Sequence, residues 1–389
     1  MTVEIAFWIA ALVVGYAYIG YPLVLALMAR WGTPPRRALT PRPRLSVVVA
    51  AYNEAGVIEA KIRSALEQSY PADRLEVIVV SDGSSDGTDE RVRGFADRRV
   101  RLVRQEPRAG KSLALNRGVS VATGDLLIFT DANALFGPDS LARLAAGFHD
   151  PRVGLVSGQG LYAAGDAEAP RAVGNGYVRY EAFIKSRESL LGFVASADGA
   201  IYALRREIYR DLGPAEVNDL LHPIQAALDG YSSRFDGHAF TMEPPSPGSG
   251  SEFRRHVRII AQGFTLLATW LPRLVAARRW RATWMLVSHR LLRWVSAPCL
   301  AVALGANAWL AVGEPFYRLT LAGQAAFYGL ALLGLLAERA ALPLGKLAVP
   351  YYFCVVSAAG VGGFVRYLRG GGEAVWTPRG EASMKDRAA

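Results

Sequence analysis

Residues 45–54 read LSVVVAAYNE, residues 75–88 read LEVIVVSDGSSDGT, and residues 126–133 read LLIFTDAN. Each segment is a short run of apolar and β-branched residues that ends in polar residues, which is typical of a buried strand followed by a loop. Residues 100–104 have the same apolar character, and residues 55–68 have a helical spacing of apolar positions. Strands that alternate with helices predict an α/β domain with a mostly parallel sheet covered on both faces.

The polar residues of these segments follow the carboxyl ends of the predicted strands. In open α/β sheets ligands bind at that edge, so these residues are the first candidates for a binding site. Asp82 belongs to an Asp-Gly-Ser sequence that also favours a turn, so a purely structural role for it stays open. The candidates are Tyr52, Asn53, Glu54, Asp82, Asp131 and Asn133.

The composition places part of the chain in a membrane. Its 389 residues are 51% hydrophobic, 20% charged and have a mean hydropathy of +0.17, which excludes a disordered protein. The two cysteines exclude a disulfide-stapled scaffold. The net charge of +10 comes mainly from arginines in residues 30–44 and 252–293, and both stretches flank apolar segments. Anionic headgroups explain that placement better than nucleic acid, so we expect no nucleic-acid partner.

The first apolar segment, residues 5–28, contains no charged residue and is long enough to span a bilayer. A cleaved signal peptide would have basic residues before a shorter apolar run. Here Glu4 precedes the run and the arginines follow it, so we expect an uncleaved anchor with its N-terminus outside.

Three more charge-free runs, 295–313, 319–337 and 347–365, have the length of spanning helices. Four spans in total would put the C-terminus outside, although the tail is basic. The last run contains Pro350 and three glycines, so a re-entrant hairpin there stays open. Residues 256–294 instead place apolar residues on one helical face and arginines on the others, which predicts two amphipathic helices at the membrane interface.

Six segments, in this order and spacing, resemble glycosyltransferase family 2, whose members are inverting enzymes with the GT-A nucleotide-sugar fold. They are VVVAAYNEAGVIEAKIRSALEQSYP, VIVVSDGSSDGT, GKSLALNRG, ATGDLLIFTDAN, ADGAIYALRRE and RRHVRI. The resemblance covers about residues 44–262, and the apolar segments around it resemble those of the multi-pass members. We therefore expect an α/β GT-A domain with a mostly parallel mixed sheet and with transmembrane helices at both ends.

The resemblance divides the chain into six parts. They are an N-terminal transmembrane anchor (1–29), a basic Pro-rich linker (30–44), a GT-A catalytic domain (45–255), amphipathic interfacial helices (256–294), a C-terminal transmembrane region (295–368) and a polar tail (369–389).

The resemblance also implies residues that bind the nucleotide-sugar. Tyr52, Glu54 and Asp82 match the positions that hold the base and ribose, and Lys111 lies in the GKS segment. Asp131 and Asn133 occupy the places of the DxD metal motif, which implies Mg²⁺ or Mn²⁺. Asn133 departs from that motif, because an amide is a weaker ligand than a carboxylate. It could instead be a turn residue, or lie behind the metal ligands or against the sugar.

The general base of the family usually ends an acidic pair, and Asn218-Asp219 lies at that place. We expect Asp219 to be the base, although a helix cap is the alternative. Asp198 is the second choice, and its place in the family more often shapes the acceptor pocket.

The Q-x-x-R-W run of the family is replaced here by residues 255–259. Arg255 and Arg258 could clamp a diphosphate or bind lipid headgroups. Ile259 stands where processive members have a tryptophan, which argues against polymer synthesis.

The expected function is that of a membrane-bound inverting glycosyltransferase at the cytoplasmic face of the cell membrane. It would transfer a sugar from a nucleotide-sugar, in the first place a UDP-sugar, to a lipid-linked or polysaccharide acceptor of the cell envelope. Its partners would be this donor, a lipid-linked or glycan acceptor, and membrane lipids. A processive polysaccharide synthase is one alternative, and a non-catalytic membrane partner with a transferase-like domain is the other.

Overall fold

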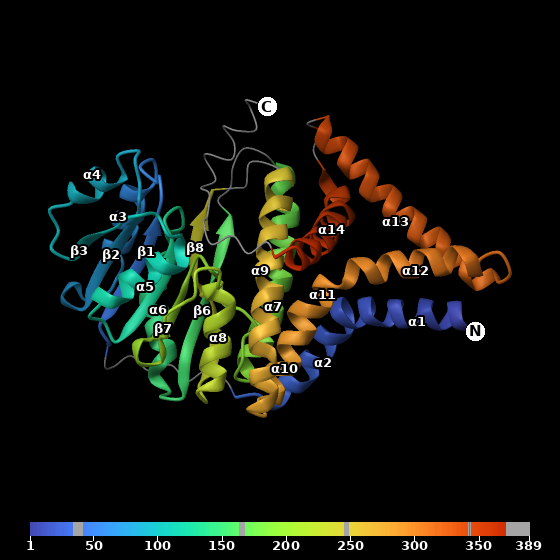
Figure 1. Ribbon diagram of the computed structural model, residues 1–389, viewed down its shortest axis with the longest axis horizontal. Helices are drawn as coiled ribbons and strands as arrows, with labels where there is room; N and C mark the ends of the chain where they lie inside the picture. Colours follow the sequence, from blue (N-terminus) through green and yellow to red (C-terminus); the bar gives the residue numbers. More distant parts are fainter. Residues whose placement is uncertain (34–41, 163–167, 245–248, 341, 343, 371–389) are drawn as a thin grey trace.

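The computed structural model describes residues 1–389 except 34–41, 163–167, 245–248, 341, 343 and 371–389. Most of the Pro-rich linker and of the polar tail therefore lie outside the described residues. An α/β domain forms one end of the molecule, and long apolar helices extend from its other end (Figure 1).

A mixed sheet is the centre of the α/β domain, and the described residues contribute eight strands to it in the order β3-β2-β1-β4-β7-β6-β8-β5. Four of these strands, β1 to β4, confirm the strands expected from the apolar runs. The strands are β1 (Leu45–Ala51), β2 (Leu75–Asp82), β3 (Val100–Gln105), β4 (Leu126–Asp131), β5 (Leu135–Phe136), β6 (Val153–Tyr162), β7 (Tyr202–Arg205) and β8 (Ser232–Glu243).

The first half of the sheet is parallel, because β1 pairs with β2 and β4, and β2 pairs with β3. In its register Ala51 lies opposite Ser81, and Ala50 lies opposite Asp131. The polar segments after these strands therefore emerge at one edge of the sheet. In the second half β7 runs antiparallel to β4 and β6, while β6 and β8 are parallel.

Helices cover both faces of the sheet. One face packs against α3 (Ile58–Leu66), α4 (Thr88–Arg93) and α6 (Ser140–Ala146), and the other packs against α5 (Lys111–Val121) and α8 (Asn218–Leu228). The expected helix at 55–68 is confirmed as α3, whose residues Ile58, Ile62 and Ala65 are completely buried.

Two long helices connect the sheet to the apolar helices. These are α7 (Glu168–Leu190), which packs on β8, and α9 (Ser249–Ala276), which packs on α8. On its other side α7 contacts α2 and α14, and α9 contacts α14. Figure 1 shows α7 and α9 between the sheet and the apolar helices. The apolar part comprises α1 (Thr2–Gly15), α2 (Tyr21–Met28), α10 (Trp280–Leu286), α11 (Leu292–Trp294), α12 (Ser296–Leu310), α13 (Pro315–Arg339) and α14 (Ala348–Leu368).

Four helices among the described residues are long and apolar enough to cross a membrane, or five if one bent pair forms a single span. The four are Thr2–Trp31, Glu252–Ala276, Pro315–Arg339 and Gly345–Leu368. Of the apolar runs expected to span the membrane, 295–313 alone does not form a qualifying helix by itself. Its helix α12 ends at Leu310 after 15 residues and meets the helix over Trp280–Trp294 at a bend of 57°. By length and composition the run therefore qualifies only together with the residues before it.

Helices α9 and α14 differ from the amphipathic and re-entrant segments that the sequence left open. α9 continues through Pro272 to Ala276, so the proline does not end it. The re-entrant alternative for the last run is wrong, because α14 is one continuous helix. Its glycines serve close packing instead: a Cβ at Gly360 would come within 2.5 Å of the Trp294 carbonyl oxygen, and one at Gly363 within 2.6 Å of Ile260.

Candidate active site

The carboxylate of Asp131 and the ammonium group of Lys111 form the centre of the predicted site. Asp131 ends β4 and Lys111 begins α5, and the Lys111 Nζ lies 2.5 Å from Asp131 Oδ1. Both side chains are partly exposed, at 37% and 29%. The parallel register of β1 and β4 and the start of α5 therefore bring two sequence-predicted residues into direct contact, at the expected edge of the sheet.

The residues present fit a divalent cation that takes most of its ligands from phosphate oxygens and water. Asp131 offers a partly exposed carboxylate, and Asn133 lies two residues on in the turn before β5. The described part of the chain contains no group of three or more His, Cys, Asp or Glu side chains arranged to hold a metal. Mg²⁺ commonly binds through one or two protein oxygens together with phosphate oxygens and water, which matches this donor set.

Asp82 is buried and holds the loop that leads to Lys111. Its Oδ1 accepts hydrogen bonds from Gln105 Nε2 at 2.7 Å and from the Ala109 N–H at 2.8 Å, and its Oδ2 accepts from the Gly110 N–H at 2.8 Å. With 3% of its surface exposed, this carboxylate fixes the loop before α5. A contact with the base or ribose stays a prediction.

Tyr52 and Glu54 follow β1 on the same edge as Asp82. The guanidinium of Arg108, which lies in the loop fixed by Asp82, covers the ring of Tyr52 at 3.4 Å. The main chain of Glu54 is held by Thr88, whose Oγ1 accepts its N–H at 2.9 Å. The loop after β1 and the loop before α5 are thus in contact, and Tyr52 presents its ring to a cation.

Asp219 lies in the first turn of α8, close to Asp198 and Lys111. A Cβ built at Gly199 would lie 3.2 Å from Asp219 Oδ2, which puts the ADGA segment directly against the carboxylate. Burial raises the pKa of Asp219, the positive charge of Lys111 opposes that shift, and the negative charge of Asp198 adds to it. Asp219 Oδ1 is buried and has no hydrogen-bond partner in the described residues.

Both carboxylate oxygens of Asp198 accept hydrogen bonds from main-chain N–H groups. Its Oδ2 accepts from the Gly160 N–H at 2.9 Å, and its Oδ1 accepts from the Ala200 N–H at 3.2 Å. These bonds join the loop before β7 to β6. They suit a residue that shapes a pocket better than one that exchanges protons, because both oxygens already accept hydrogen bonds.

A buried network below Asp219 was not foreseen from the sequence. The Asn218 Nδ2 donates to the Tyr202 hydroxyl at 2.6 Å, and that hydroxyl lies 2.8 Å from His222 Nδ1. Because the hydroxyl oxygen accepts from Asn218, its own hydrogen is free to point at His222 Nδ1, and the tautomer of the histidine sets which of the two donates. Burial lowers the pKa of His222 to about 3, so the imidazole is neutral. The network explains why an amide stands at 218, since an ionised carboxylate has no N–H to donate.

Lys61 is a second buried residue that the sequence did not single out. Its Nζ donates to Thr130 Oγ1 at 2.7 Å and to the Ala134 carbonyl, and lies 3.6 Å from the centre of the Phe136 ring. Burial lowers the pKa of this fully buried lysine far below its ordinary value. The lysine thereby supports the turn between β4 and β5 from below. Its only sequence signal was a charged residue on the apolar face of the α3 pattern.

The arginines at 255 and 258 lie on α9, beside the ends of β6 and β8. The Arg255 Nη1 lies 3.3 Å from Glu252 Oε1, and the charges of Tyr162 and Glu243 act on it. No contact between Arg255 and Asp131 is observed among the described residues. The arginine stands over the second half of the sheet, away from the contact between Lys111 and Asp131.

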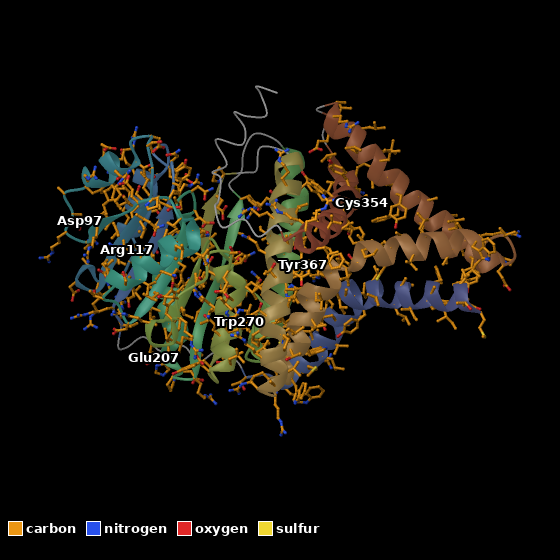
Figure 2. All side chains as sticks on the ribbon, viewed as in Figure 1. Asp97, Arg117, Glu207, Trp270, Cys354 and Tyr367 are labelled. Atoms are coloured by element: carbon orange, nitrogen blue, oxygen red, sulfur yellow. The ribbon has the colours of Figure 1, made fainter. Side chains whose placement is uncertain are left out.

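α9 also touches the segment that carries Asp219. Trp270 of α9 is labelled in Figure 2, and its Nε1 donates to Glu216 Oε1 at 3.1 Å. The main-chain carbonyl of Glu216 accepts from Ser112 Oγ at 2.7 Å. Glu216 therefore connects α9 to α5 just before Asn218-Asp219.

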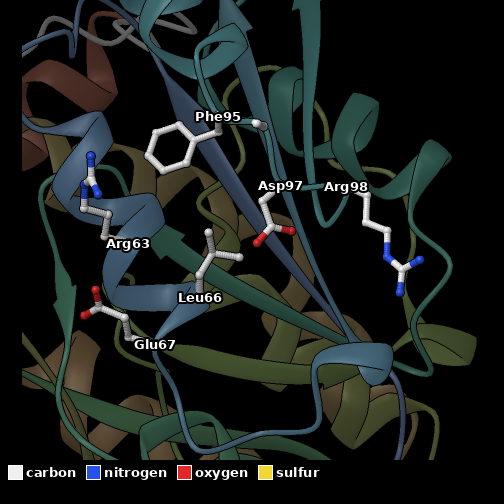
Figure 3. A pocket seen from close by; sticks show the side chains of 7 residues that line it. Arg63, Leu66, Glu67, Phe95, Asp97 and Arg98 are labelled. Atoms are coloured by element: carbon white, nitrogen blue, oxygen red, sulfur yellow. The ribbon is translucent and has the colours of Figure 1, made fainter.

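A hollow of about 540 Å³ on the surface lies elsewhere (Figure 3). It is formed by the end of α3 and the loop after α4, where Arg63 stacks near Phe95. None of the predicted site residues lines it. We therefore assign the candidate site to the edge of the sheet and not to this hollow. The lining residues are Arg63, Leu66, Glu67, Phe95, Ala96, Asp97 and Arg98.

Comparison with known proteins gives a family match and several relatives. Residues 46–213 match the model of Glycosyl transferase family 2. The probable glycosyltransferase YdaM of Bacillus subtilis is 29% identical over 212 residues, which are 52% of this chain and 50% of that protein. The poly-beta-1,6-N-acetyl-D-glucosamine synthase of Staphylococcus aureus is 25% identical over 230 residues, 57% of this chain and 55% of that protein. This chain thus spans about half the length of these two relatives.

A solved structure covers more of the chain. The mannosyltransferase PcManGT from Pyrobaculum calidifontis, in complex with GDP-Man and Mn²⁺, is 27% identical and aligns with a TM-score of 0.68. The alignment covers 93% of this chain and 99% of that chain, so it includes most of the apolar helices as well as the sheet. The expected GT-A type of α/β fold with apolar helices at both ends is confirmed.

Proposed function

Because this chain carries a family 2 glycosyltransferase domain over residues 46–213, we propose that it is a membrane-bound inverting glycosyltransferase. It transfers one sugar at a time from a nucleotide-sugar to a lipid-linked or glycan acceptor. The observation that carries this proposal is the position of Lys111. Its ammonium group contacts the carboxylate of Asp131, and its positive charge lowers the pKa of Asp219. Asp131, assigned to the donor, and Asp219, assigned to the acceptor, therefore lie on either side of the Lys111 ammonium group.

In the proposed reaction the acceptor hydroxyl attacks the anomeric carbon as the bond to the diphosphate oxygen breaks. Asp219 takes the proton of that hydroxyl. Burial suits Asp219 to this step, because a raised pKa brings a carboxylate closer to the pH at which it must accept a proton. A single displacement of this kind inverts the configuration at the anomeric carbon.

The diphosphate gains negative charge as it leaves, and two groups are available to stabilise it. Lys111 supplies a fixed positive charge beside Asp131. Asp131, together with Asn133, would hold Mg²⁺ or Mn²⁺, and the cation would neutralise part of the charge on the diphosphate. The Mn²⁺ in PcManGT supports a metal of this kind. Arg255 and Arg258 are assigned to the acceptor side of the site.

The base and ribose are assigned to the loop after β1, with the ring of Tyr52 as the stacking surface. Glu54 is proposed to contact the nucleotide as well, and Asp82 acts on it through the loop that it holds. A UDP-sugar is the donor expected from the sequence. GDP-mannose is the second candidate, because PcManGT, which aligns over 93% of this chain, holds GDP-Man.

The apolar helices are proposed to span the cell membrane, with the α/β domain on the cytoplasmic side where nucleotide-sugars are found. Arginines at 30–44 and 252–293 lie next to that domain, which agrees with the positive-inside rule. α9 is proposed to lie at the interface and to hold the site near a membrane-bound acceptor. Biosynthesis of a cell-envelope polysaccharide or glycolipid is the process that such a site would serve.

A screen of nucleotide-sugars tests the proposal. The purified full chain in nanodiscs is incubated with UDP-glucose, UDP-N-acetylglucosamine, UDP-galactose or GDP-mannose, with Mn²⁺ or with EDTA. Release of UDP or GDP, and of labelled sugar into lipid extract, is measured. We expect turnover with one donor, lost in EDTA and in Asp219→Asn. No release or transfer with any donor, in the presence of total membrane lipid, would contradict the enzymatic proposal and favour a non-catalytic partner protein.

A further inference from the structure

Helix α3 places a lysine where its pattern calls for an apolar residue. Lys61 lies among Ile58, Ile62 and Ala65 on the face that packs against the sheet, and all four residues are completely buried. Burying a polar or charged group costs free energy, and buried charged groups can often be replaced by well-packed apolar residues without loss of stability. Folding alone therefore gives no reason for a lysine at this position, and its contacts point to another one.

The amine of Lys61 contacts both ends of one turn. Its Nζ donates to Thr130 Oγ1 at 2.7 Å and to the Ala134 carbonyl, and its third direction faces the Phe136 ring, whose centre lies 3.6 Å away. An ammonium group has three N–H bonds, so these contacts use its full capacity. Between the two hydrogen-bonded residues lie residues 131–133, which carry the side chains assigned to the cation and which we call the metal turn.

Two more polar side chains extend this row along the same segment. The Phe136 N–H donates to Ser64 Oγ at 3.3 Å, and Gln68 Nε2 donates to the carbonyl of the next residue at 3.0 Å. Lys61, Ser64 and Gln68 follow one another at intervals of three and four residues, so they lie on one side of the helix. Lys61 is the member of this row whose hydrogen bonds flank the metal turn.

Thr130 continues the contact toward the acceptor side. Its hydroxyl donates to the Ala200 carbonyl at 2.7 Å, and because a carbonyl only accepts, the hydroxyl oxygen is left to accept from Lys61. Ala200 belongs to the ADGA segment, in which a Cβ at Gly199 would lie 3.2 Å from Asp219 Oδ2. One buried hydroxyl therefore connects the start of the metal turn to the segment that packs against the proposed base.

We propose that Lys61 and Thr130 are positioning residues of the transfer reaction, which fix the metal turn relative to the ADGA segment beside Asp219. Both are buried and act through the main chain of the two segments. The inference rests on the proposed function, because it assumes that Asp131 holds the donor and that Asp219 receives the acceptor. A displacement of about 1 Å between reacting groups can cost about 10² in rate, so a fixed relation between the two segments matters for transfer.

Replacement of Thr130 tests the connection between the two sides. Thr130→Val keeps the shape of the side chain and removes the hydroxyl. We expect kcat for sugar transfer to fall about tenfold or more while the KM values of donor and acceptor stay within about twofold, because each segment keeps its other contacts. Thr130→Ser, which retains the hydroxyl, should keep most of the parent kcat. A kcat of Thr130→Val equal to that of the parent would overturn the proposal.

Thr241→Val is the matched control. Thr241 is a completely buried threonine of β8 in the same sheet, and its Oγ1 has no hydrogen-bond partner in the part of the chain that the structure describes. The substitution therefore removes a buried hydroxyl without breaking a bond. We expect its kcat to stay within about twofold of the parent. A loss as large as that of Thr130→Val would show that any buried threonine of this sheet has the same effect, which would overturn the specific role of Thr130.

Replacement of Lys61 tests the hold on the metal turn. Lys61→Met exchanges the amine for an apolar chain of similar length. We expect the affinity for UDP in the presence of Mn²⁺, measured by calorimetry, to fall about tenfold or more, and the affinity in EDTA to change little. The unfolding temperature should stay near that of the parent, because removal of a buried amine offsets the lost hydrogen bonds. A lower unfolding temperature with an unchanged Mn²⁺-dependent affinity would show a purely structural lysine and overturn this role.

Hydrogen exchange reads the connection without ligand or turnover. The N–H groups of Ala200 and Ile201 bond Asp198, and we expect the peptide that covers 195–202 to exchange faster in Thr130→Val and in Lys61→Met than in the parent or in Thr241→Val. Unchanged exchange in both variants would overturn the connection. Faster exchange in a chain that transfers no sugar from any donor would contradict the proposed function and leave the connection intact. Turnover by the parent that persists unaltered in Thr130→Val would do the reverse.

Discussion

The main-chain N–H of Ala197 donates a 2.8 Å hydrogen bond to the main-chain carbonyl of Asp219. Within a regular helix that carbonyl would accept from residue 223, but Pro223 has no N–H to donate. The proline therefore leaves the Asp219 carbonyl free for a partner outside α8. The bond fixes the loop that contains Asp198 against the first turn of α8. The carboxylates of Asp198 and Asp219 are therefore held in fixed positions relative to each other.

Replacement of Asp219 by Asn tests its assignment as the base. The amide has nearly the same shape but accepts no proton, so we expect sugar transfer to fall by about 10²–10⁴, the usual share of general-base catalysis. Affinity for the nucleotide should stay within a few fold of the parent, because the donor is assigned to Asp131 and Lys111. Single-turnover transfer and UDP binding are the measurements.

Asp229→Asn, at the other end of α8, is the control for that helix. It should transfer sugar like the parent. The pH profile gives a second check: because burial raises the pKa of Asp219, the acid limb of kcat/KM should lie above pH 3.8, with activity lost as the pH falls through it. Near-normal turnover in Asp219→Asn would exclude this residue as the base.

Replacement of Asp131 by Ala tests the donor side. We expect metal-dependent nucleotide binding to be lost, because Asp131 is the carboxylate assigned to the cation, and Lys111 would lose its partner at the same time. The affinity for UDP is measured by calorimetry with Mn²⁺ and with EDTA. Asp73→Ala, an exposed residue before β2, is the control. If Asp131→Ala binds UDP with Mn²⁺ as tightly as the parent does, Asp131 does not belong to the site.

The buried histidine gives a prediction about stability. Folding lowers the pKa of His222 from about 6.5 to about 3, so between these values the unfolded chain binds a proton that the folded chain does not. Stability from this residue is complete above pH 6.5 and is lost as the pH falls toward 3, by up to roughly 1.4 kcal/mol per pH unit.

Thermal unfolding of the full chain in detergent, measured between pH 7.5 and 4.5, checks this dependence. The variant His222→Asn should flatten it, at the cost of a lower unfolding temperature at pH 7.5, because the bond from Tyr202 is weakened. His238→Asn, which removes an exposed histidine, should keep the slope of the parent. An unchanged slope in His222→Asn would show that other groups cause the acid sensitivity.

The sequence predicted the first half of the sheet closely, because its strands are unbroken apolar runs that end in polar residues. Strands β1, β2, β3 and β4 lie on the apolar parts of segments 45–54, 75–88, 100–104 and 126–133, and β3 extends one residue past its segment. The strands of the second half are less apolar, and β8 contains Arg234, Asp236 and His238. Their pairing depends on contacts between distant segments, which local patterns do not specify.

The site was predicted in the same uneven way. Motif positions gave Asp131, Lys111 and Asp219, and the fold brings these together. The residues that support them could not be found, because Tyr202, His222 and Lys61 act through burial and through partners far along the chain. Asn218 was read as a departure from an acidic pair. The role of this amide follows only from the structure, in which it donates a hydrogen bond to the Tyr202 hydroxyl.

The arrangement of the apolar helices predicts an orientation in the membrane. Figure 1 shows the N-terminus and the turn between α12 and α13 at one end of these helices and the α/β domain at the other. Because α14 packs along α9, which is proposed to lie at the interface, we expect three spans: the N-terminal helix, the bent pair that ends in α12, and α13. With three spans we expect Arg366 and Arg369 on the inside, where the positive-inside rule favours basic residues.

Single cysteines in a Cys299→Ala, Cys354→Ala background test this topology. In intact cells, cysteines at Thr2 and Gly313 should react with a membrane-impermeant maleimide, and cysteines at Asp73 and Arg369 should react only after lysis. Labelling of the cysteine at Asp73 in intact cells would place the domain on the wrong side for its donor. Labelling at Arg369 alone would restore a fourth span.

The length of the product depends on what the chain offers to a growing polymer. A processive enzyme holds the new sugar end on an aromatic surface and exports the chain along a polar path. Ile259 provides no aromatic face, and the amides of Asn307 and Gln324 lie 2.7 Å apart in a hydrogen bond to each other. Asn307 is completely buried, so α12 and α13 use their amides to bind one another and not to line a water-filled conduit.

We therefore expect the purified chain to add one or a few sugars to an acceptor. Gel filtration of radiolabelled product should show the label at the size of the acceptor plus a few residues. The variant Ile259→Trp tests the role of the aromatic surface alone. It should not lengthen the product, because a stacking face without a polar path still gives the polymer no route away from the site. Labelled material of high molecular weight, made by the parent chain without any other protein, would contradict both parts of this prediction.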